Sequence, residues 1–344
     1  MIPAPFLLYL GHHAEPLGIK TSRGLAVFRP EDCVGEFRHA DCPLTLGLPR
    51  LGMAEAAAKG ARTLVLGIAG AGGELPRGAV EDAAAALEAG MHVASGLHQR
   101  LRDQPKLVAL AEQSGLRLFD VRDPPTDLTV GTGYPRAGRR LLTVGTDCSV
   151  GKMYATIALA RGLRARGHAA DFRATGQTGI LIAGAGVPAD AVVADFISGA
   201  IEGLAPARDD DGWDVIEGQG SLFHPSFAGV SLGLLHGAQP EAIVLCHEPG
   251  RAHMRGLPGR PMPDLAECLR RNLEAARLTS PEVRAVGVCL NTSGLDRVAA
   301  ARLCAETQDR LGLPCTDPHA HGVEPIIDEL LCHASSTPAT TASR

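Results

Sequence analysis

The sequence predicts an α/β protein of two domains, each built on a parallel sheet covered by helices. Short apolar runs of strand length end in glycine or in polar residues, and segments with helical spacing alternate with these runs. A stretch rich in proline, glycine and charge divides the chain into two halves. With 344 residues, of which 45% are hydrophobic, the chain is long enough and apolar enough for two cores.

The first domain is predicted to span residues 1–122. Its expected strands are the apolar runs FLLYLG, RTLVLGIA and MHVASG. The alanine-rich segments 53–59 and 80–89 lie between these runs and have helical spacing. Alternation of strand, glycine-rich turn and helix indicates a parallel sheet. The GAGG turn lacks the spacing of a dinucleotide-binding fingerprint.

A linker is predicted at residues 123–140, whose sequence DPPTDLTVGTGYPRAGRR sustains neither helix nor strand. The second domain is expected over residues 141–333. Its expected strands are RRLLTVG, AADFRATG, WDVIEGQGS, AIVLCHEPG and RAVGVCLNTSG, and its expected helices are 152–166, 265–276 and 296–311. The tail 334–344 has no apolar periodicity, so we expect it to be disordered.

Composition excludes several classes of function. A net charge of −5 and an aromatic content of 3% argue against nucleic-acid binding, which needs a basic surface and stacking side chains. The apolar runs are too short and interrupted to span a membrane, and the N-terminus lacks the pattern of a secretory signal. Nine cysteines without zinc-like spacing suit free thiols in a reducing cytoplasm. We therefore expect a cytoplasmic protein with small-molecule partners, and its glycine- and alanine-rich surfaces suit a homo-oligomer.

The stretch GTDCSVGKM, residues 145–153, follows an apolar strand and precedes a helix, as a phosphate-binding loop does. Such a loop aims backbone N–H groups at phosphate oxygens, and the helix N-terminus and the lysine add positive charge. The expected cofactor-binding residues are Gly145, Thr146, Asp147, Cys148, Ser149, Val150, Gly151, Lys152 and Met153.

Met153 departs from the usual loop, which has Ser or Thr after its lysine to ligate magnesium. A thioether is a poor ligand for that hard cation. The loop therefore predicts phosphate binding without magnesium-assisted phosphoryl transfer. If magnesium does bind, Asp147 and Glu217 are the residues expected to hold it through water. For Cys148, packing is preferred over a role as an acetyl-carrying thiol.

Polar residues follow the other strands of the second domain, and ligands of parallel sheets bind beyond those carboxyl ends. Glu217 follows one strand, and Ser221 and His224 come soon after it. A carboxylate or an imidazole there can act as a base, although Glu217 can also serve only to cap neighbouring amides. Further expected contacts at strand ends are Arg173, Thr175, Gln177, His247, Arg255 and Asn291.

These motifs resemble known proteins. GTDCSVGK followed by VIEGQGS is similar to the dethiobiotin synthetase and cobyrinate amidase branch of P-loop proteins. A closer resemblance, to the DgcN-like family, covers nearly the whole chain. It rests on FRATGQTGILIAGAGVPADAVVADFISGAIE, WDVIEGQGSLFHPSFAGVSLGLLHG, VLCHEP, HMRGLP, LNTS and, in the first half, CVGEFRHADC, LGLPRLG and ASGLHQRL. That family has an N-terminal Rossmann-like domain and a P-loop NTPase-like domain, and a methionine after the lysine belongs to its pattern.

Members of that family are assigned as D-glutamate N-acetyltransferases that use acetyl-CoA, so the resemblance implies an N-acetyltransferase (an acyltransferase). We hypothesise that the loop binds CoA phosphates and that Arg255 binds a substrate carboxylate, with Arg173, Thr175 and His247 as further substrate contacts. Either Glu217 or His224 deprotonates the amine, and either Gln177 or Ser221 donates to the carbonyl oxygen. Asn291 is expected at the nucleobase. The alternatives are an ATP-dependent ligase or kinase acting on a carboxylate, and a nucleotide-sensing module without catalysis.

Overall fold

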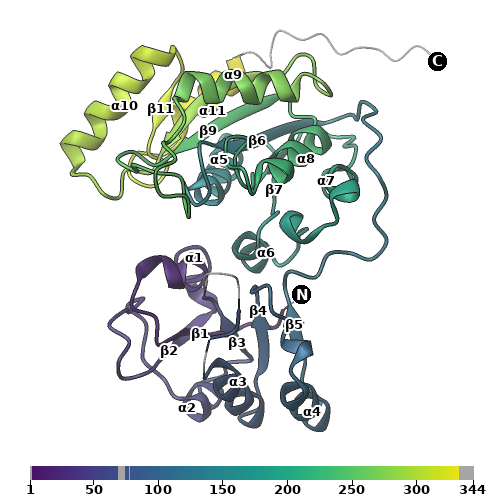
Figure 1. Ribbon diagram of the computed structural model, residues 1–344, viewed down its shortest axis with the longest axis vertical. Helices are drawn as coiled ribbons and strands as arrows, with labels where there is room; N and C mark the ends of the chain where they lie inside the picture. The colour runs from purple at the N-terminus through teal and green to yellow at the C-terminus, as the bar shows by residue number, and fades with distance from the viewer. Residues whose placement is uncertain (1, 69–73, 77, 333–344) are drawn as a thin grey trace. The chain divides into compact units, whose positions relative to one another are not determined.

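The computed structural model describes residues 2–68, 74–76 and 78–332 (Figure 1). The GAGG turn and the predicted disordered tail lie outside these residues. The chain forms two compact units: Met1–Pro124 with Gly176–Ala191, and Pro125–Thr175 with Val192–Arg344.

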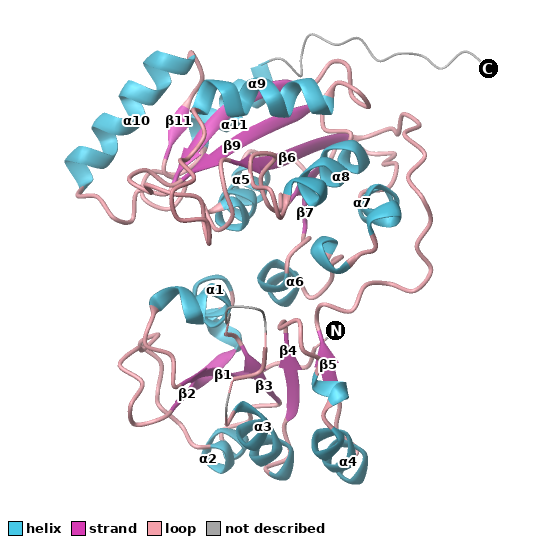
Figure 2. Cartoon of the chain, in the orientation of Figure 1, coloured by secondary structure: helices cyan, strands magenta, loops and turns pink. Residues whose placement is uncertain are grey.

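The first unit has a five-stranded parallel sheet in the order β2-β1-β3-β4-β5 (Figure 2). The strands are β1 Phe6–Gly11, β2 Cys33–Arg38, β3 Thr63–Leu66, β4 His92–Ser95 and β5 Leu118–Asp120. The helices are α1 Lys20–Phe28, α2 Met53–Ala58, α3 Ala79–Glu88, α4 Pro105–Ser114 and α6 Gln177–Ala183.

Strand β1 shows how this sheet is covered on both faces. Leu7 and Tyr9 belong to a core cluster with residues of α2, α3 and α4, whereas Phe6 and Leu8 belong to a second cluster with residues of α1 and α6. Successive side chains of a strand point to opposite faces, so a strand covered on both sides is apolar throughout. This is why FLLYLG reads as a continuous apolar run.

The second unit has a six-stranded parallel sheet in the order β11-β10-β9-β6-β8-β7. Its strands are β6 Arg139–Gly145, β7 Ala170–Arg173, β8 Trp213–Ile216, β9 Ala242–His247, β10 Arg284–Leu290 and β11 Cys315–Thr316. Its helices are α5 Lys152–Ala165, α7 Ile197–Leu204, α8 Ala228–Ala238, α9 Leu265–Ala276, α10 Arg297–Leu311 and α11 Glu324–Cys332.

Strand β6 lies inside this sheet, between β9 and β8. Helices α5 and α11 pack together over one face, and α8 packs against β6, α7 and α9 to cover the other (Figure 1). The strand order reverses beside β6, and such a switch point is where parallel sheets bind ligands. Among the described residues, no helix combines the length and apolar character needed to cross a bilayer.

The predicted fold class is confirmed: both sheets are parallel and covered by helices. The division near residue 124 lies at the start of the predicted linker 123–140. Residues Gly176–Ala191 pack with the first unit, although they fall within the segment 141–333 that we assigned to the second domain. In this segment Thr178 forms a buried hydroxyl–hydroxyl hydrogen bond of 2.8 Å with Thr21, and the carbonyl of Leu181 accepts from Arg29.

Candidate active site at the phosphate loop

The phosphate loop connects the end of β6, at Gly145, to the start of α5, at Lys152. Two residues in the loop have positive φ angles, Ser149 at 54° and Gly151 at 98°. Glycine adopts this conformation readily, whereas serine does so at a cost that its surroundings must offset. The strand–loop–helix arrangement that the sequence predicts is therefore present. The loop bends at Ser149 as well as at Gly151.

Lys152 is buried and folds back over the loop. Its Nζ atom donates to the carbonyl oxygens of Asp147 at 2.7 Å and Gly220 at 2.8 Å. A Cβ atom on Gly145 would lie 2.9 Å from Nζ, so this glycine leaves room for the ammonium group. Burial lowers the pKa of Lys152. Within the described part of the chain the ammonium group is bound only by carbonyl oxygens, which a phosphate oxygen can replace.

Asp147 is fully buried, and both of its carboxylate oxygens accept hydrogen bonds from the protein. Oδ1 accepts from the backbone N–H of Cys148 at 2.7 Å. Oδ2 accepts from Nη1 of Arg251 at 2.8 Å and from the backbone N–H of Arg255 at 2.7 Å. Residues 2–68, 74–76 and 78–332 contain no group of three or more His, Cys, Asp and Glu side chains arranged to hold a metal ion. In this arrangement Asp147 holds the loop together.

The segment 248–261 after β9, which we call the arginine loop, lies against the phosphate loop. Arg251 donates to the carbonyls of Cys148 at 2.7 Å and Ser149 at 3.1 Å, and it also pairs with Glu248. The guanidinium group of Arg255 donates to the hydroxyl of Ser149. These contacts support the positive-φ conformation of Ser149. They also place Arg255 at the phosphate loop.

Glu217 follows β8 and is almost fully buried, with 4% of its surface exposed. Its Oε2 accepts from the backbone N–H of Thr175 at 3.0 Å, and its own carbonyl accepts from the Thr175 hydroxyl at 2.5 Å. Because the adjacent Gly218 passes close to β6, a Cβ atom there would lie only 1.8 Å from the carbonyl oxygen of Thr143. The close passage fixes Glu217 at the carboxyl end of the sheet, in the same unit as the phosphate loop.

His247 ends β9, and Asn291 follows directly after β10. Both residues therefore lie at the carboxyl end of the sheet, as the phosphate loop does. Nδ1 of His247 lies 2.9 Å from the Thr146 hydroxyl, and within the described chain no hydrogen bond reaches its Nε2. Burial, followed by the nearby Arg251 guanidinium, lowers the pKa of His247 to about 4. Asn291 donates its backbone N–H to the His247 carbonyl, and its Cβ lies 3.7 Å from where a Cβ on Gly151 would stand. His247 is therefore neutral near pH 7, with one ring nitrogen available.

His224 has no ring nitrogen available to act as a base. Its side chain is buried, Nδ1 accepts from the backbone N–H of Ser226 at 3.2 Å, and Nε2 lies 3.0 Å from the carbonyl oxygen of Arg255. An N–H can only donate, so Nε2 carries the proton and donates to Arg255. Ser221 is also engaged, since its hydroxyl donates to the Thr146 carbonyl at 3.0 Å. Both residues brace loops around the site.

Two further predicted site residues have side chains engaged by other partners. Arg173 belongs to an ion-pair network: its Nε donates to the buried Asp214 at 2.7 Å, and Arg208 joins the same carboxylate at 3.0 Å. Gln177 belongs to the first unit, where it packs on Gly96 so closely that a Cβ on that glycine would lie 2.1 Å from its Oε1.

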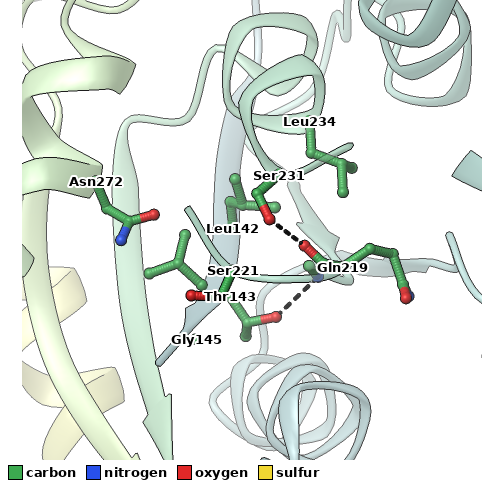
Figure 3. Close-up of a pocket in the computed structure, with 10 residues that line it drawn as sticks. Leu142, Thr143, Gly145, Gln219, Ser221, Ser231, Leu234 and Asn272 are labelled. Atoms are coloured by element: carbon green, nitrogen blue, oxygen red, sulfur yellow. Dashed lines mark hydrogen bonds between the residues drawn. The ribbon is translucent and has the colours of Figure 1, made fainter. Parts of the chain in front are cut away.

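A small cavity lies beside the turn 217–220, which we call the acidic turn (Figure 3). Thr143 and Gln219 line it, and Ser231 donates a hydrogen bond of 2.7 Å to the Gln219 carbonyl across it. Its volume of about 10 Å³ is close to the minimum for one water molecule. The cavity is therefore too small for a substrate, and the residues that line it support the acidic turn.

Arg251 is the residue that sequence reasoning undervalued. The arginine loop carries three arginines, Arg251, Arg255 and Arg260, after the end of one strand. Three arginines in one loop are typical of anion binding, but the sequence assigns no separate task to each of them. In the structure Arg251 is neutralised by Asp147 and Glu248, Arg255 lies on Ser149, and Arg260 contacts the Phe223 carbonyl.

The fold and the site together define a two-domain P-loop protein whose loop lacks the usual magnesium-binding hydroxyl. Two family models match: a domain of unknown function described as a Rossmann-like domain (DUF1611_N) over residues 35–124, and one described as a P-loop domain (DUF1611_C) over residues 129–327. The chain therefore belongs to the DUF1611 family.

Two curated relatives resemble nearly the whole chain. Both are named D-glutamate N-acetyltransferase. The protein from Pseudoalteromonas sp is 46% identical, covering 96% of this chain and 99% of that protein. The protein from Tritonibacter scottomollicae is 47% identical with the same coverage. A crystal structure of a DUF1611 family protein from Anabaena variabilis superposes with a TM-score of 0.88 at 34% identity, covering 96% of this chain and 100% of that one.

Proposed function

We propose that this protein transfers the acetyl group of acetyl-CoA to the amine of D-glutamate. The observation that carries the proposal is the similarity, over almost the full length of both chains, to two proteins named for that activity. The phosphate loop supports the same function, because CoA carries a diphosphate that such a loop can bind without cleaving it. Met153 and the engaged carboxylate of Asp147 both favour binding over phosphoryl transfer.

The donor phosphates bind where the loop presents its backbone N–H groups and the start of α5. Lys152 exchanges its carbonyl partners for phosphate oxygens. Asn291, beside Gly151, lies where the nucleotide portion of the donor extends from the loop. Thr175 and His247, at the ends of β7 and β9, contact the amino acid.

In the chemical step, the nitrogen of the neutral amine attacks the thioester carbonyl. A C–N bond forms, the C–S bond breaks, and CoA leaves as its thiolate. Of the two predicted bases, His224 has both ring nitrogens engaged, so Glu217 accepts the proton released from the amine nitrogen. Holding amine and thioester together makes a covalent enzyme intermediate unnecessary.

Thiol release from acetyl-CoA tests this function directly. The purified protein is assayed with D-glutamate, L-glutamate and other D- and L-amino acids, and with ATP and magnesium in parallel. Rapid thiol release that depends on D-glutamate supports the proposal. Release of ADP or AMP in the presence of a carboxylate, with acetyl-CoA left intact, replaces it with the ligase or kinase function.

A further inference from the structure

We propose that Arg255 supplies, at the diphosphate of the acyl donor, the positive charge that magnesium supplies in phosphate loops ending in Ser or Thr, and that Asp147 and Arg251 position it. This inference rests on the proposed function and names how the same site binds its donor. It assigns Arg255 to the donor diphosphate instead of the substrate carboxylate that we expected from the sequence.

The position that usually holds magnesium in a phosphate loop lacks its protein ligand here. The residue after Lys152 is Met153, which offers sulfur in place of a hydroxyl. The nearest loop carboxylate, Asp147, is buried and already accepts three hydrogen bonds. A bound diphosphate nevertheless needs compensating charge.

Arg255 is anchored by both its backbone N–H and its backbone carbonyl. Its N–H donates to Oδ2 of Asp147 at 2.7 Å, and its carbonyl accepts from Nε2 of His224. Its guanidinium group then reaches the hydroxyl of Ser149, at the bend of the phosphate loop. A guanidinium group held in this way is preorganised for two oxygens of one phosphate.

The cations around the phosphate loop differ in whether a carboxylate neutralises them. Arg251 is neutralised, because Asp147 and Glu248 both pair with it. Lys152 and Arg255 form no ion pair with any carboxylate in residues 2–68, 74–76 and 78–332. Two cations without carboxylate partners at one loop match the two negative charges of a diphosphate. Arg251 has the different task of tying the arginine loop to Asp147.

Calorimetric titration with CoA tests the inference without turnover. Wild type is titrated in EDTA and in magnesium, and Arg255→Ala, Arg255→Lys and Arg260→Ala are titrated in EDTA. Arg260 is the matched control, since it lies in the same loop and contacts the Phe223 carbonyl instead of the phosphate loop. We expect equal wild-type affinity in both buffers, a loss of about 10- to 100-fold for Arg255→Ala, partial rescue by Arg255→Lys and no loss for Arg260→Ala.

Two further arms locate the contact. Adenosine 3′,5′-bisphosphate carries the 3′-phosphate of CoA but has no diphosphate, so Arg255→Ala should leave its affinity unchanged. Asp147→Asn should weaken CoA binding in the wild-type background and cause much less further loss in the Arg255→Ala background, because it acts through Arg255. Thermal unfolding of each variant confirms that it is folded.

The inference is overturned if wild type needs magnesium to bind CoA. It is also overturned if Arg255→Ala binds CoA as wild type does while its KM for D-glutamate rises, which is the result expected for a carboxylate contact. Failure of the proposed function looks different: wild type itself then binds neither CoA nor acetyl-CoA in either buffer.

Discussion

The carboxyl ends of the two parallel sheets use carboxylates for opposite purposes. In the first unit, Asp82 accepts from the Tyr9 hydroxyl and from Nε2 of His39, both at 2.8 Å, and His12 pairs with Asp41. These polar side chains around Asp82 and Asp41 are thus paired within the unit. In the second unit, Asp147 holds a loop in place, and none of the described carboxylates forms an ion pair with Lys152 nearby.

The comparison shows that a parallel sheet provides an edge for binding, whereas local charge pairing decides what that edge can bind. Both edges collect polar side chains after their strands. Only in the second do the described residues combine a phosphate loop with cations left unpaired by carboxylates. The following predictions test this contrast, beginning with the largest effect.

Glu217→Gln tests whether the buried carboxylate of Glu217 acts as the general base of the reaction. As a base it accepts the amine proton, so we expect kcat to fall by about 100- to 10,000-fold. The affinity for CoA should stay the same, because we propose that Glu217 acts at the amine, whereas the phosphate loop binds the donor phosphates. Steady-state rates and calorimetry separate the two effects. Normal turnover would show that Glu217 only caps the Thr175 amide.

Lys152→Ala tests the unpaired cation of the phosphate loop. Removing a charged donor to phosphate should weaken CoA binding by about 100-fold, measured by calorimetry. Asp82→Asn is the counterpart in the first unit, where it disturbs the hydrogen bonds to Tyr9 and His39. We expect that variant to lower stability and to leave CoA affinity unchanged. Equal losses of affinity in both variants would contradict the contrast between the two edges.

Gly218→Ala tests how tightly the acidic turn is built against β6. The added Cβ would meet the carbonyl oxygen of Thr143 at 1.8 Å, so backbone has to move, and we expect a destabilisation of about 1–3 kcal/mol or more. Gly203→Ala is the matched control, because nothing lies within 4 Å of the added carbon in α7. It should stabilise the protein by up to about 1 kcal/mol. Denaturant unfolding measures both changes.

The pH dependence of stability tests the burial of His247. Its pKa is lowered to about 4 in the folded protein, from an ordinary value of 6.5. Between these values the unfolded chain binds a proton that the folded chain does not, so this residue lowers stability as pH falls from about 6.5 toward 4. His247→Gln should make the unfolding midpoint less sensitive to pH over that range. An unchanged pH slope in the variant would contradict the assigned pKa.

Local patterns predicted most of the elements that form the site. Helix α9 has the predicted bounds, and α10 begins one residue later than expected because Asp296 is its N-cap and accepts from the N–H groups of Val298 and Ala299. The phosphate loop was recognisable because its function depends on contiguous residues. The short helix α6 was not expected, and its place in the first unit depends on contacts between residues far apart in sequence, such as Thr21 and Thr178.

The roles of single side chains were harder to predict, because they depend on which partner occupies each polar atom. His224 and Glu217 read equally well as bases, and only the partners of the His224 ring nitrogens separate them. Arg255 was predicted to bind the substrate carboxylate, and Arg173 was predicted as a further substrate contact. In the structure Arg173 forms an ion pair with Asp214, whereas Arg255 donates a hydrogen bond to the hydroxyl of Ser149. Sequence spacing carries no information about such long-range partners.

One reaction tests the central claim most directly. Wild type is incubated with acetyl-labelled acetyl-CoA, D-glutamate and ATP with magnesium together, and the products are identified by mass spectrometry. The account predicts labelled acetyl on the glutamate nitrogen, free CoA and intact ATP. Consumption of ATP with unlabelled glutamate would contradict it, because the phosphate loop would then be cleaving the phosphates that we propose it only binds.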